Sequence, residues 1–395
     1  MISEKMKGYV KNSSVIRAMF EEGKKMAAIY GADHVYDFSL GNPNVPAPAK
    51  VKEAVYDILE NEDSLMVHGY MSNSGYEDVR GTIAEHLNGL YGTSYSAENL
   101  LMIVGAAGGM NVFMKTILNP GDEVITFSPY FTEYRAYVTN YDGRLVEIPC
   151  DAETFQPDVE ALAANVSERT KAVIINSPNN PTGVVYSRES LMAVARVLSE
   201  KEKEFGHPIF IFSDEPYREI VYGDYEVPWI PDLYKNTVVG YSYSKSLSLP
   251  GERIGWLCFP SEIDDFSDMI AGANVANRIL GFVNAPSLMQ RVVARCLDEK
   301  TDVAYYAENR RVLMEGLSKA GFTFVEPQGA FYLWLKSPED DEKAFVAKAK
   351  EKQILIVPGS SFGKSGWTRL AYCVSHETVK NSLPGFAELA KEYGL

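Results

Sequence analysis

The sequence predicts an α/β protein built around a mainly parallel sheet, and three observations support this prediction. From about residue 100 onward, short segments rich in Val and Ile alternate with helix-like segments, and strands that alternate with helices form βαβ units. These short segments are largely apolar, as expected for strands buried on both faces. The chain has 395 residues, of which 46% are hydrophobic and 23% charged, an ordinary balance for a globular protein with a large core.

Two helices are predicted ahead of the alternating region. Residues 14–30 and residues 51–59 carry apolar side chains at helical spacing. Between them, the segment Asp37–Pro43 indicates a loop, because Gly41 and Pro43 interrupt regular structure.

Seven segments are predicted to form the main sheet. Each is short and is bounded by Gly, Pro, Asn or Ser, which favours a strand. Periodicity alone does not separate such a segment from a short buried helix. The segments are Leu100–Val104, Glu123–Phe127, Leu145–Ile148, Lys171–Asn176, Pro208–Ser213, Thr237–Tyr241 and Ile254–Phe259.

The pattern changes after residue 285. Residues 288–317 predict a long helical stretch. Four strand-like segments follow it, with helix-like segments between them and at the end, so the C-terminal region predicts a smaller α+β unit. These segments are Phe322–Val325, Ala330–Lys336, Ile354–Val357 and Thr368–Tyr372.

The composition argues against several classes of protein. Lys and Arg number 38 and Asp and Glu number 53, which gives a net charge of −15, so the chain would repel nucleic-acid phosphates and anionic lipids. No apolar segment approaches the ~20 residues of a membrane-spanning helix, and the N-terminus lacks the apolar segment of a secretory signal. We therefore expect neither a nucleic-acid partner nor a membrane partner.

The cysteines and histidines do not form a metal or disulfide pattern. The four cysteines are far apart without a C-x-x-C pair, and the five histidines are scattered without an H-E-x-x-H motif. We therefore expect no metal, and we expect a protein of the reducing cytoplasm. The cysteines are Cys150, Cys258, Cys296 and Cys373.

The first predicted strand leads into a run of small residues. Ligands of open parallel sheets bind beyond the carboxyl ends of the strands, and Gly105, Ala106 and Ala107 stand at this end, ahead of a helical pattern from Met110. Small residues let the backbone approach an anion, and a helix N-terminus attracts it. The run is compatible with a phosphate-binding turn and equally with a tight turn that needs small residues.

Two further strand ends carry an aromatic ring and an amide. Tyr130 follows the second strand and could stack on a flat ligand, although a tyrosine of the core would give the same pattern. Asn180 lies in the turn Ser177–Gly183, whose prolines and asparagines build a rigid connection that would direct the amide into the strand-end crevice.

The remaining strand ends carry a carboxylate and a lysine. Asp214 ends an apolar strand, where a buried charge needs a partner, so it either caps the next segment or pairs with a cationic ligand group. Lys245 follows the sixth strand, near Ser242 and Ser244. Burial lowers the pKa of a lysine and exposes a nucleophilic amine; a surface lysine is the alternative.

Together these residues resemble the class I and II aminotransferases, which are pyridoxal 5′-phosphate enzymes of fold type I. The resemblance extends from Gly41-Asn42-Pro43 to Arg369 and depends on the order and spacing of its motifs. It implies a large domain, residues 46–287, with a mainly parallel seven-stranded sheet flanked by helices, and a smaller discontinuous α+β domain, residues 1–45 and 288–395. The motifs are Asn180-Pro181-Thr182-Gly183, Asp214-x-x-Tyr217, and Ser242-x-Ser244-Lys245 followed by Pro250-Gly251-x-Arg253-x-Gly255.

The resemblance implies pyridoxal 5′-phosphate as cofactor and three catalytic residues. Lys245 would form a Schiff base with the aldehyde and later act as general base and acid. Asp214 would keep the ring nitrogen protonated, and Tyr217 would donate a hydrogen bond to the phenolic oxygen, as would Asn180. The implied cofactor-binding residues are Gly105, Ala106, Ala107, Tyr130, Asn180, Asp214, Tyr217, Ser242, Ser244, Lys245, Arg253 and Tyr70.

The resemblance also implies how a substrate binds. Arg369 matches the family position for the α-carboxylate, which a guanidinium binds in bidentate fashion, and Asn180 and the backbone of Gly41 would help. Tyr70 matches a tyrosine that reaches the phosphate of the neighbouring subunit, which implies a homodimer with shared active sites. X-Pro bonds allow the cis peptides that this family often holds at the position before Pro129 and the position before Pro181.

The motifs indicate less about which side chain the substrate carries. Some aspartate-using relatives carry a lysine in the phosphate turn, where this chain has Ala107. Arg278 precedes Asn284-Ala285-Pro286 and is a candidate for binding an acidic substrate across the dimer; an arginine of the helix surface is the alternative.

The resemblance implies an aminotransferase that moves an amino group between an α-amino acid and a 2-oxo acid by a ping-pong mechanism. A C–S β-lyase or another lyase with the same cofactor would keep the same motifs, since these do not determine which bond breaks. A non-catalytic protein that binds the cofactor is a further alternative. Ser242-Tyr243-Ser244-Lys245 also matches the S-x-x-K motif of penicillin-binding enzymes, but neither S-D-N nor K-T-G follows.

Overall fold

The computed structural model describes residues 1–11 and 15–395, without the side chains of residues 15–18 and 20. The helix predicted over residues 14–30 corresponds to α2 from residue 15 onward, and Ser14 lies outside the described residues. None of the helices described has both the length and the apolar character that crossing a membrane would require. The helices are α1 (Glu4–Lys11), α2 (Val15–Tyr30), α3 (Ala49–Asn61), α4 (Ser64–His68), α5 (Glu77–Tyr91), α6 (Gly105–Ile117), α7 (Glu133–Thr139), α8 (Val159–Asn165), α9 (Arg188–Phe205), α10 (Tyr243–Ser246), α11 (Phe266–Ile279), α12 (Ser287–Ala294), α13 (Val303–Lys319), α14 (Glu342–Glu351) and α15 (His376–Tyr393), with 3₁₀ turns at Ala32–His34, Ala97–Asn99, Ile230–Asp232 and Gly359–Phe362.

The main sheet has seven strands in the order β2-β8-β7-β6-β5-β3-β4. Strand β8 runs antiparallel to its neighbours β2 and β7, whereas the other neighbours are parallel. All seven predicted strands are confirmed, because each observed strand overlaps its predicted segment. The strands are β2 (Leu100–Ile103), β3 (Glu123–Ser128), β4 (Arg144–Pro149), β5 (Thr170–Asn176), β6 (Phe210–Asp214), β7 (Thr237–Ser242) and β8 (Gly255–Cys258).

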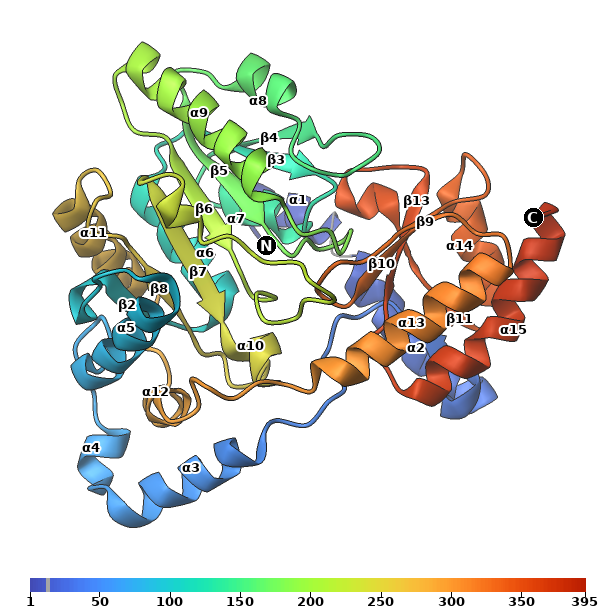
Figure 1. Cartoon of the computed structure of the whole chain (residues 1–395), viewed down its shortest axis with the longest axis horizontal. Helices are drawn as coiled ribbons and strands as arrows, with labels where there is room; N and C mark the ends of the chain where they lie inside the picture. Colours follow the sequence, from blue (N-terminus) through green and yellow to red (C-terminus); the bar gives the residue numbers. More distant parts are fainter. Residues whose placement is uncertain (12–14) are drawn as a thin grey trace.

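Helices cover both faces of this sheet, as Figure 1 shows. Successive side chains of a strand point to opposite faces, so Val173 of β5 packs in the apolar core shared with α8 and α9. Its neighbour Ile174 packs in the core shared with α6, α7 and α11. Both residues are at most 2% exposed, which explains why the strand sequence is apolar throughout.

A third group of helices covers the sheet near β2 and β8. Helices α3, α5 and α12 share one apolar core with β2, β7 and β8, through residues such as Ile58, Ile83 and Val292. In Figure 1, α3 and α4 lie along the lower edge of the molecule, where α3 packs on α12.

A smaller antiparallel sheet packs with α13, α14 and α15. Its strand order is β12-β13-β10-β9, and a separate parallel pair joins β1 and β11. The short strand β1 was not predicted, because two residues carry no periodicity. The strands are β1 (Tyr36–Asp37), β9 (Phe324–Val325), β10 (Tyr332–Lys336), β11 (Ile354–Leu355), β12 (Val357–Pro358) and β13 (Trp367–Ala371).

The prediction of one long helical stretch over residues 288–317 is wrong in its middle. Helix α12 ends at Ala294 and α13 begins only at Val303. The carboxylate of Asp302 accepts a hydrogen bond from the backbone N–H of Tyr305 and so caps α13. The break lets α12 pack on α3 and α5 while α13 packs on α15.

Candidate active site

A cavity of about 300 Å³ lies at the carboxyl ends of β5, β6 and β7. The parallel register places Asn176 beside Asp214, and Asp214 beside Gly240, so the polar ends of these strands meet at one edge. The cavity is lined by most of the predicted site residues: Gly41, Ala106, Ala107, Asn180, Asp214, Tyr217, Ser242, Ser244, Lys245, Arg253 and Arg369.

Lys245 extends into this cavity from the short helix α10. Ser242 caps α10, because its hydroxyl accepts a hydrogen bond from the backbone N–H of Ser244. The Nζ of Lys245 donates to the carbonyl of Gly41 at 2.6 Å. Burial, with smaller contributions from nearby Arg369, lowers the pKa of Lys245 to about 8. A lysine with this pKa has a substantial fraction of neutral, nucleophilic amine near neutral pH.

This lowered pKa predicts how the cofactor-free protein responds to pH. Mixing it with pyridoxal 5′-phosphate and following the absorption band of the bound cofactor is expected to give a capture rate that rises with pH. The rate should reach half of its plateau near pH 8, where half of Lys245 is neutral, and level off about one pH unit higher. A capture rate that keeps rising toward pH 10.5, the range of an ordinary lysine, would contradict the lowered pKa.

Asp214 is buried and has one free oxygen. Its Oδ2 accepts a hydrogen bond from the hydroxyl of Tyr134, whereas its Oδ1 has no hydrogen-bond partner in the part of the chain that the structure describes. Burial raises the pKa of Asp214 to about 6, and the hydrogen bond from Tyr134 opposes that rise. Asp214 is therefore ionised at neutral pH, and an unpaired buried oxygen is costly, so the geometry fits a ligand that presents a protonated nitrogen.

Tyr134 and Asn176 were not predicted. The amide of Asn176 donates to the backbone oxygen of Asp214 at 2.9 Å, and its side-chain oxygen accepts from the backbone N–H of Asn180. These contacts fix the strand end that carries the carboxylate. Asn176 ends a predicted strand, a signal that could have identified it, whereas Tyr134 is one of 24 tyrosines and gave no signal of its own.

Arg369 is buried, lines the same cavity and has no carboxylate partner among the described side chains. One terminal nitrogen donates to the side-chain oxygen of Asn180 at 3.1 Å, and the other donates to the backbone oxygen of Ser39. Its guanidinium carbon lies 4.6 Å from the ring centre of Tyr332 and 4.7 Å from that of Phe362. A buried guanidinium without a counterion fits a ligand that brings its own carboxylate.

The small residues at the start of α6 lie next to Arg253. Gly105 has φ +76°, and a β-carbon there would collide with the Arg253 guanidinium. Arg253 donates to the carbonyls of Pro250 and Val104 at 2.9 and 3.2 Å, and the hydroxyls of Ser242 and Ser244 lie 2.7 Å apart. A helix N-terminus, two hydroxyls and a guanidinium together fit a phosphate.

A Gly105→Ala substitution is expected to weaken the binding of pyridoxal 5′-phosphate about tenfold or more. The β-carbon displaces Arg253, and alanine is strained at φ +76°, with a cost of about 1–3 kcal/mol. Titration of the cofactor-free variant by absorbance measures the affinity. Gly251→Ala is the matched control, because a β-carbon at Gly251 meets none of the described atoms within 4 Å. Equal losses in both variants would contradict a role for the contact between Gly105 and Arg253.

The structure corrects the position predicted for Tyr130. Phe131, not Tyr130, lines the cavity. The ring of Tyr130 is buried in the apolar core with Tyr134, and its hydroxyl accepts a hydrogen bond from Arg135. The peptide bonds before Pro129 and Pro181 are cis as expected, and the bond before Pro178 is cis as well.

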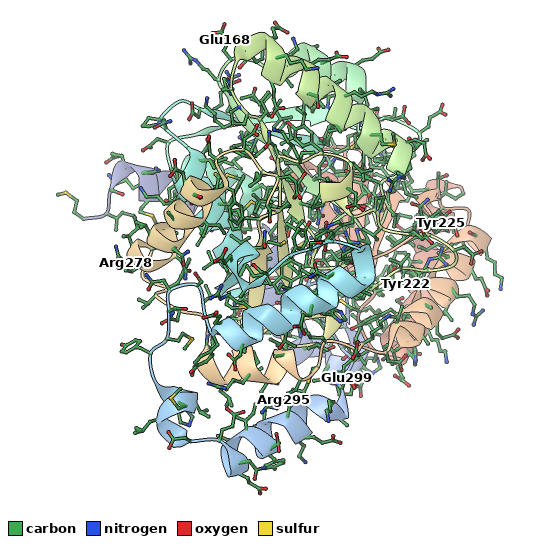
Figure 2. All side chains as sticks on the ribbon, turned by 60° about the vertical axis from the view of Figure 1, so that its left-hand side comes forward. Glu168, Tyr222, Tyr225, Arg278, Arg295 and Glu299 are labelled. Atoms are coloured by element: carbon green, nitrogen blue, oxygen red, sulfur yellow. The ribbon has the colours of Figure 1, made fainter. Side chains whose placement is uncertain are left out.

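Tyr70 and Arg278 do not reach the cavity of their own chain. Tyr70 is 94% exposed after α4, and Arg278 is exposed in the last turn of α11. Figure 2 shows Arg278 at the outer edge of the molecule. A role of either residue at an active site therefore requires a second subunit.

The fold and this cavity define a pyridoxal 5′-phosphate enzyme, because the cofactor needs an amine, a carboxylate for its ring nitrogen and a phosphate site at one sheet edge. The family model for aminotransferase class I and II matches residues 33–384, and the chain belongs to this family. It is a pyridoxal 5′-phosphate-dependent aminotransferase.

Three relatives illustrate the similarity. An aspartate aminotransferase of Thermotoga maritima is 32% identical over 93% of this chain and 95% of its own. An aspartate/prephenate aminotransferase of Thermus thermophilus is also 32% identical, over 89% of this chain and 90% of its own. The crystal structure of an amino transferase from Eubacterium rectale superposes with a TM-score of 0.97, at 46% identity and over 100% of both chains.

Proposed function

We propose that Lys245 carries the proton and Arg369 binds the α-carboxylate in the transfer of an amino group from an α-amino acid to a 2-oxo acid. The observation that supports this assignment is the charge pattern of the cavity. One cavity is lined by a lysine of lowered pKa, a buried guanidinium and a carboxylate. Among the described residues, the guanidinium has no counterion and one oxygen of the carboxylate has no hydrogen-bond partner.

Arg369 and Lys245 have separate roles in the proposed reaction. When bound, pyridoxal 5′-phosphate supplies an aldehyde that reacts with amines and a ring that withdraws electrons. Arg369 binds the substrate carboxylate in bidentate fashion and so holds the α-carbon in the cavity. The Nζ of Lys245 would take the proton from that carbon and deliver it to the former aldehyde carbon of the cofactor, so that the amino group stays with the cofactor when the 2-oxo acid leaves. Repeating these steps in reverse with a 2-oxo acid gives ping-pong kinetics.

The other residues hold and tune the cofactor. Asp214 keeps the ring nitrogen protonated through its free oxygen. Tyr217 and Asn180 would donate hydrogen bonds to the phenolic oxygen. Phe131 would stack on the cofactor ring, the role that the sequence suggested for Tyr130. The phosphate contacts are assigned to Gly105, Ala106, Ala107, Ser242, Ser244 and Arg253.

We further propose a homodimer in which Tyr70 reaches the phosphate of the partner's cofactor and Arg278 contacts the partner's substrate. The support is an exposed apolar patch beside Tyr70, where Leu65 and Met66 of α4 are 82% and 61% exposed. Such patches mark interaction surfaces. We also propose a cytoplasmic location, which four free cysteines support.

We also propose the division into a large domain and a small, discontinuous domain. Phe38, Phe345 and Phe386 share one apolar core, which supports joining the N-terminal segment to the C-terminal unit. Val292 of α12 packs instead with α3 and α5. The proposed boundary at residue 287 is therefore better placed after α12.

The first experiment is an absorbance spectrum of the protein with pyridoxal 5′-phosphate, before and after adding glutamate or aspartate without any 2-oxo acid. A cofactor band that converts to the pyridoxamine form supports the proposal and identifies the donor. Absence of a band removes Lys245 from its role. Pyruvate and ammonia released from cystathionine without a 2-oxo acid would instead favour the C–S β-lyase.

A further inference from the structure

Tyr332 lies between the residues assigned to the cofactor and those assigned to the substrate. It is the first residue of β10 and is only 2% exposed. Its hydroxyl lies 2.8 Å from the hydroxyl of Tyr217, and its ring faces the guanidinium of Arg369. A β-carbon at Gly41 would collide with the Tyr332 hydroxyl, so this hydroxyl lies against Gly41. The carbonyl oxygen of Gly41 accepts the hydrogen bond from Lys245.

The pair of hydroxyls has a preferred direction of donation. Each phenol carries one proton, so one tyrosine donates to the other. Burial raises the pKa of both groups, and the charge of Arg369 opposes that rise in both. The guanidinium carbon of Arg369 lies 4.6 Å from the ring centre of Tyr332, so the charge acts directly on this phenol and makes it a stronger hydrogen-bond donor. Tyr332 is therefore the better donor, and the proton of Tyr217 remains available for a ligand in the cavity.

We propose that Tyr332 is a positioning residue that directs the hydroxyl proton of Tyr217 toward the cofactor oxygen and links that contact to the occupancy of Arg369. The inference rests on the proposed roles of Tyr217 and Arg369. When a carboxylate binds, the charge of Arg369 is neutralised, and Tyr332 becomes a weaker donor. The hydrogen bond from Tyr217 to the cofactor oxygen then weakens, so the cofactor responds to a bound substrate before any proton moves.

The charged and titratable groups around Tyr332 support this assignment. Tyr217, Arg369 and Cys373 are the groups that influence its pKa, and of these only Arg369 carries a charge at neutral pH. Asn180 forms a second connection, because its side-chain oxygen accepts from Arg369 at 3.1 Å. Removing the Tyr332 hydroxyl is therefore expected to reduce the response to a carboxylate without abolishing it.

The test uses the complete holoenzyme and the Tyr332→Phe variant, which keeps the ring. The pH titration of the cofactor absorption band is recorded with and without saturating maleate, a carboxylate without an amine. A weaker donor leaves more negative charge on the cofactor oxygen, which favours protonation nearby, so the variant's midpoint is expected to rise by about half to one pH unit. Maleate should shift the midpoint of the parent upward, and the shift should be smaller in the variant.

Two further variants keep the test decisive. Tyr222→Phe is the matched control: its hydroxyl donates to the backbone oxygen of Ala330 in the same apolar core, so its midpoint should equal that of the parent. In a Tyr217→Phe background, Tyr332→Phe should change nothing further, because its effect passes through Tyr217.

Three results would overturn the inference: an unchanged midpoint in Tyr332→Phe, an undiminished response to maleate, or an equal effect without the Tyr217 hydroxyl. A parent protein that forms no cofactor band would refute the proposed function instead, so the two failures are distinguishable.

Discussion

Replacing Lys245 with alanine is expected to lower the rate of amino-group transfer about 10⁴-fold, because a positioned acid–base group contributes 10²–10⁴ and the nucleophile is lost with it. The structure gives the reason: the amine is buried in the cavity, and burial keeps its pKa near 8. The rate is measured in single turnover, by mixing the cofactor-loaded variant with an amino-acid donor and following the pyridoxamine absorbance.

The Lys245 prediction has a matched control in Lys235. This lysine is half-exposed and pairs with Asp264 at the surface, so Lys235→Ala should leave the rate unchanged. Lys245→Ala removes a charged group from a buried position and is therefore expected to fold. A variant that folds, binds the cofactor and retains more than about a tenth of the parent rate would refute the role of Lys245, since the general-base contribution alone exceeds this.

The strand ends explain how much of the site could be predicted from the sequence. Asp214 and Lys245 each follow an apolar run, and a parallel sheet brings the carboxyl ends of its strands to one edge. Residues that are distant in sequence could therefore be placed together before any contact was known. Arg369 was placed by its motif position only, because it comes from the other sheet.

Contacts between separate elements were not predictable in this way. Which of two adjacent aromatic residues faces the cavity depends on the backbone turn after β3, so Phe131 was missed. Tyr332 is proposed to act through the hydroxyl of Tyr217, which lies 115 residues earlier in the chain. No local sequence pattern indicates such a pairing. The break before α13 did leave a signal, since Asp302 is a favourable helix cap inside an otherwise continuous helical pattern.

The carboxylate is the second residue on which the rate should depend strongly. Replacing Asp214 with asparagine is expected to lower the rate of amino-group transfer about 10²- to 10³-fold, the loss typical of one preorganised electrostatic group. Asparagine keeps the shape and can still accept from Tyr134, but it has no charge to keep a ring nitrogen protonated. The single-turnover rate of the variant is compared with that of the parent at pH 7.5.

The Tyr134→Phe variant tests whether activity depends on the ionised form of Asp214 or only on the presence of its side chain. The hydrogen bond from Tyr134 lowers the pKa of Asp214, against the burial that raises it to about 6. Without that hydrogen bond the pKa rises further, so a larger fraction of the carboxyl is protonated at a given pH. The variant should therefore lose more activity than the parent as the pH falls toward 6 and recover as the pH rises, whereas Asp214→Asn should stay slow at every pH. Parallel pH profiles for the two variants would contradict a role for the ionised carboxylate, because only a titrating group recovers when protons are withdrawn.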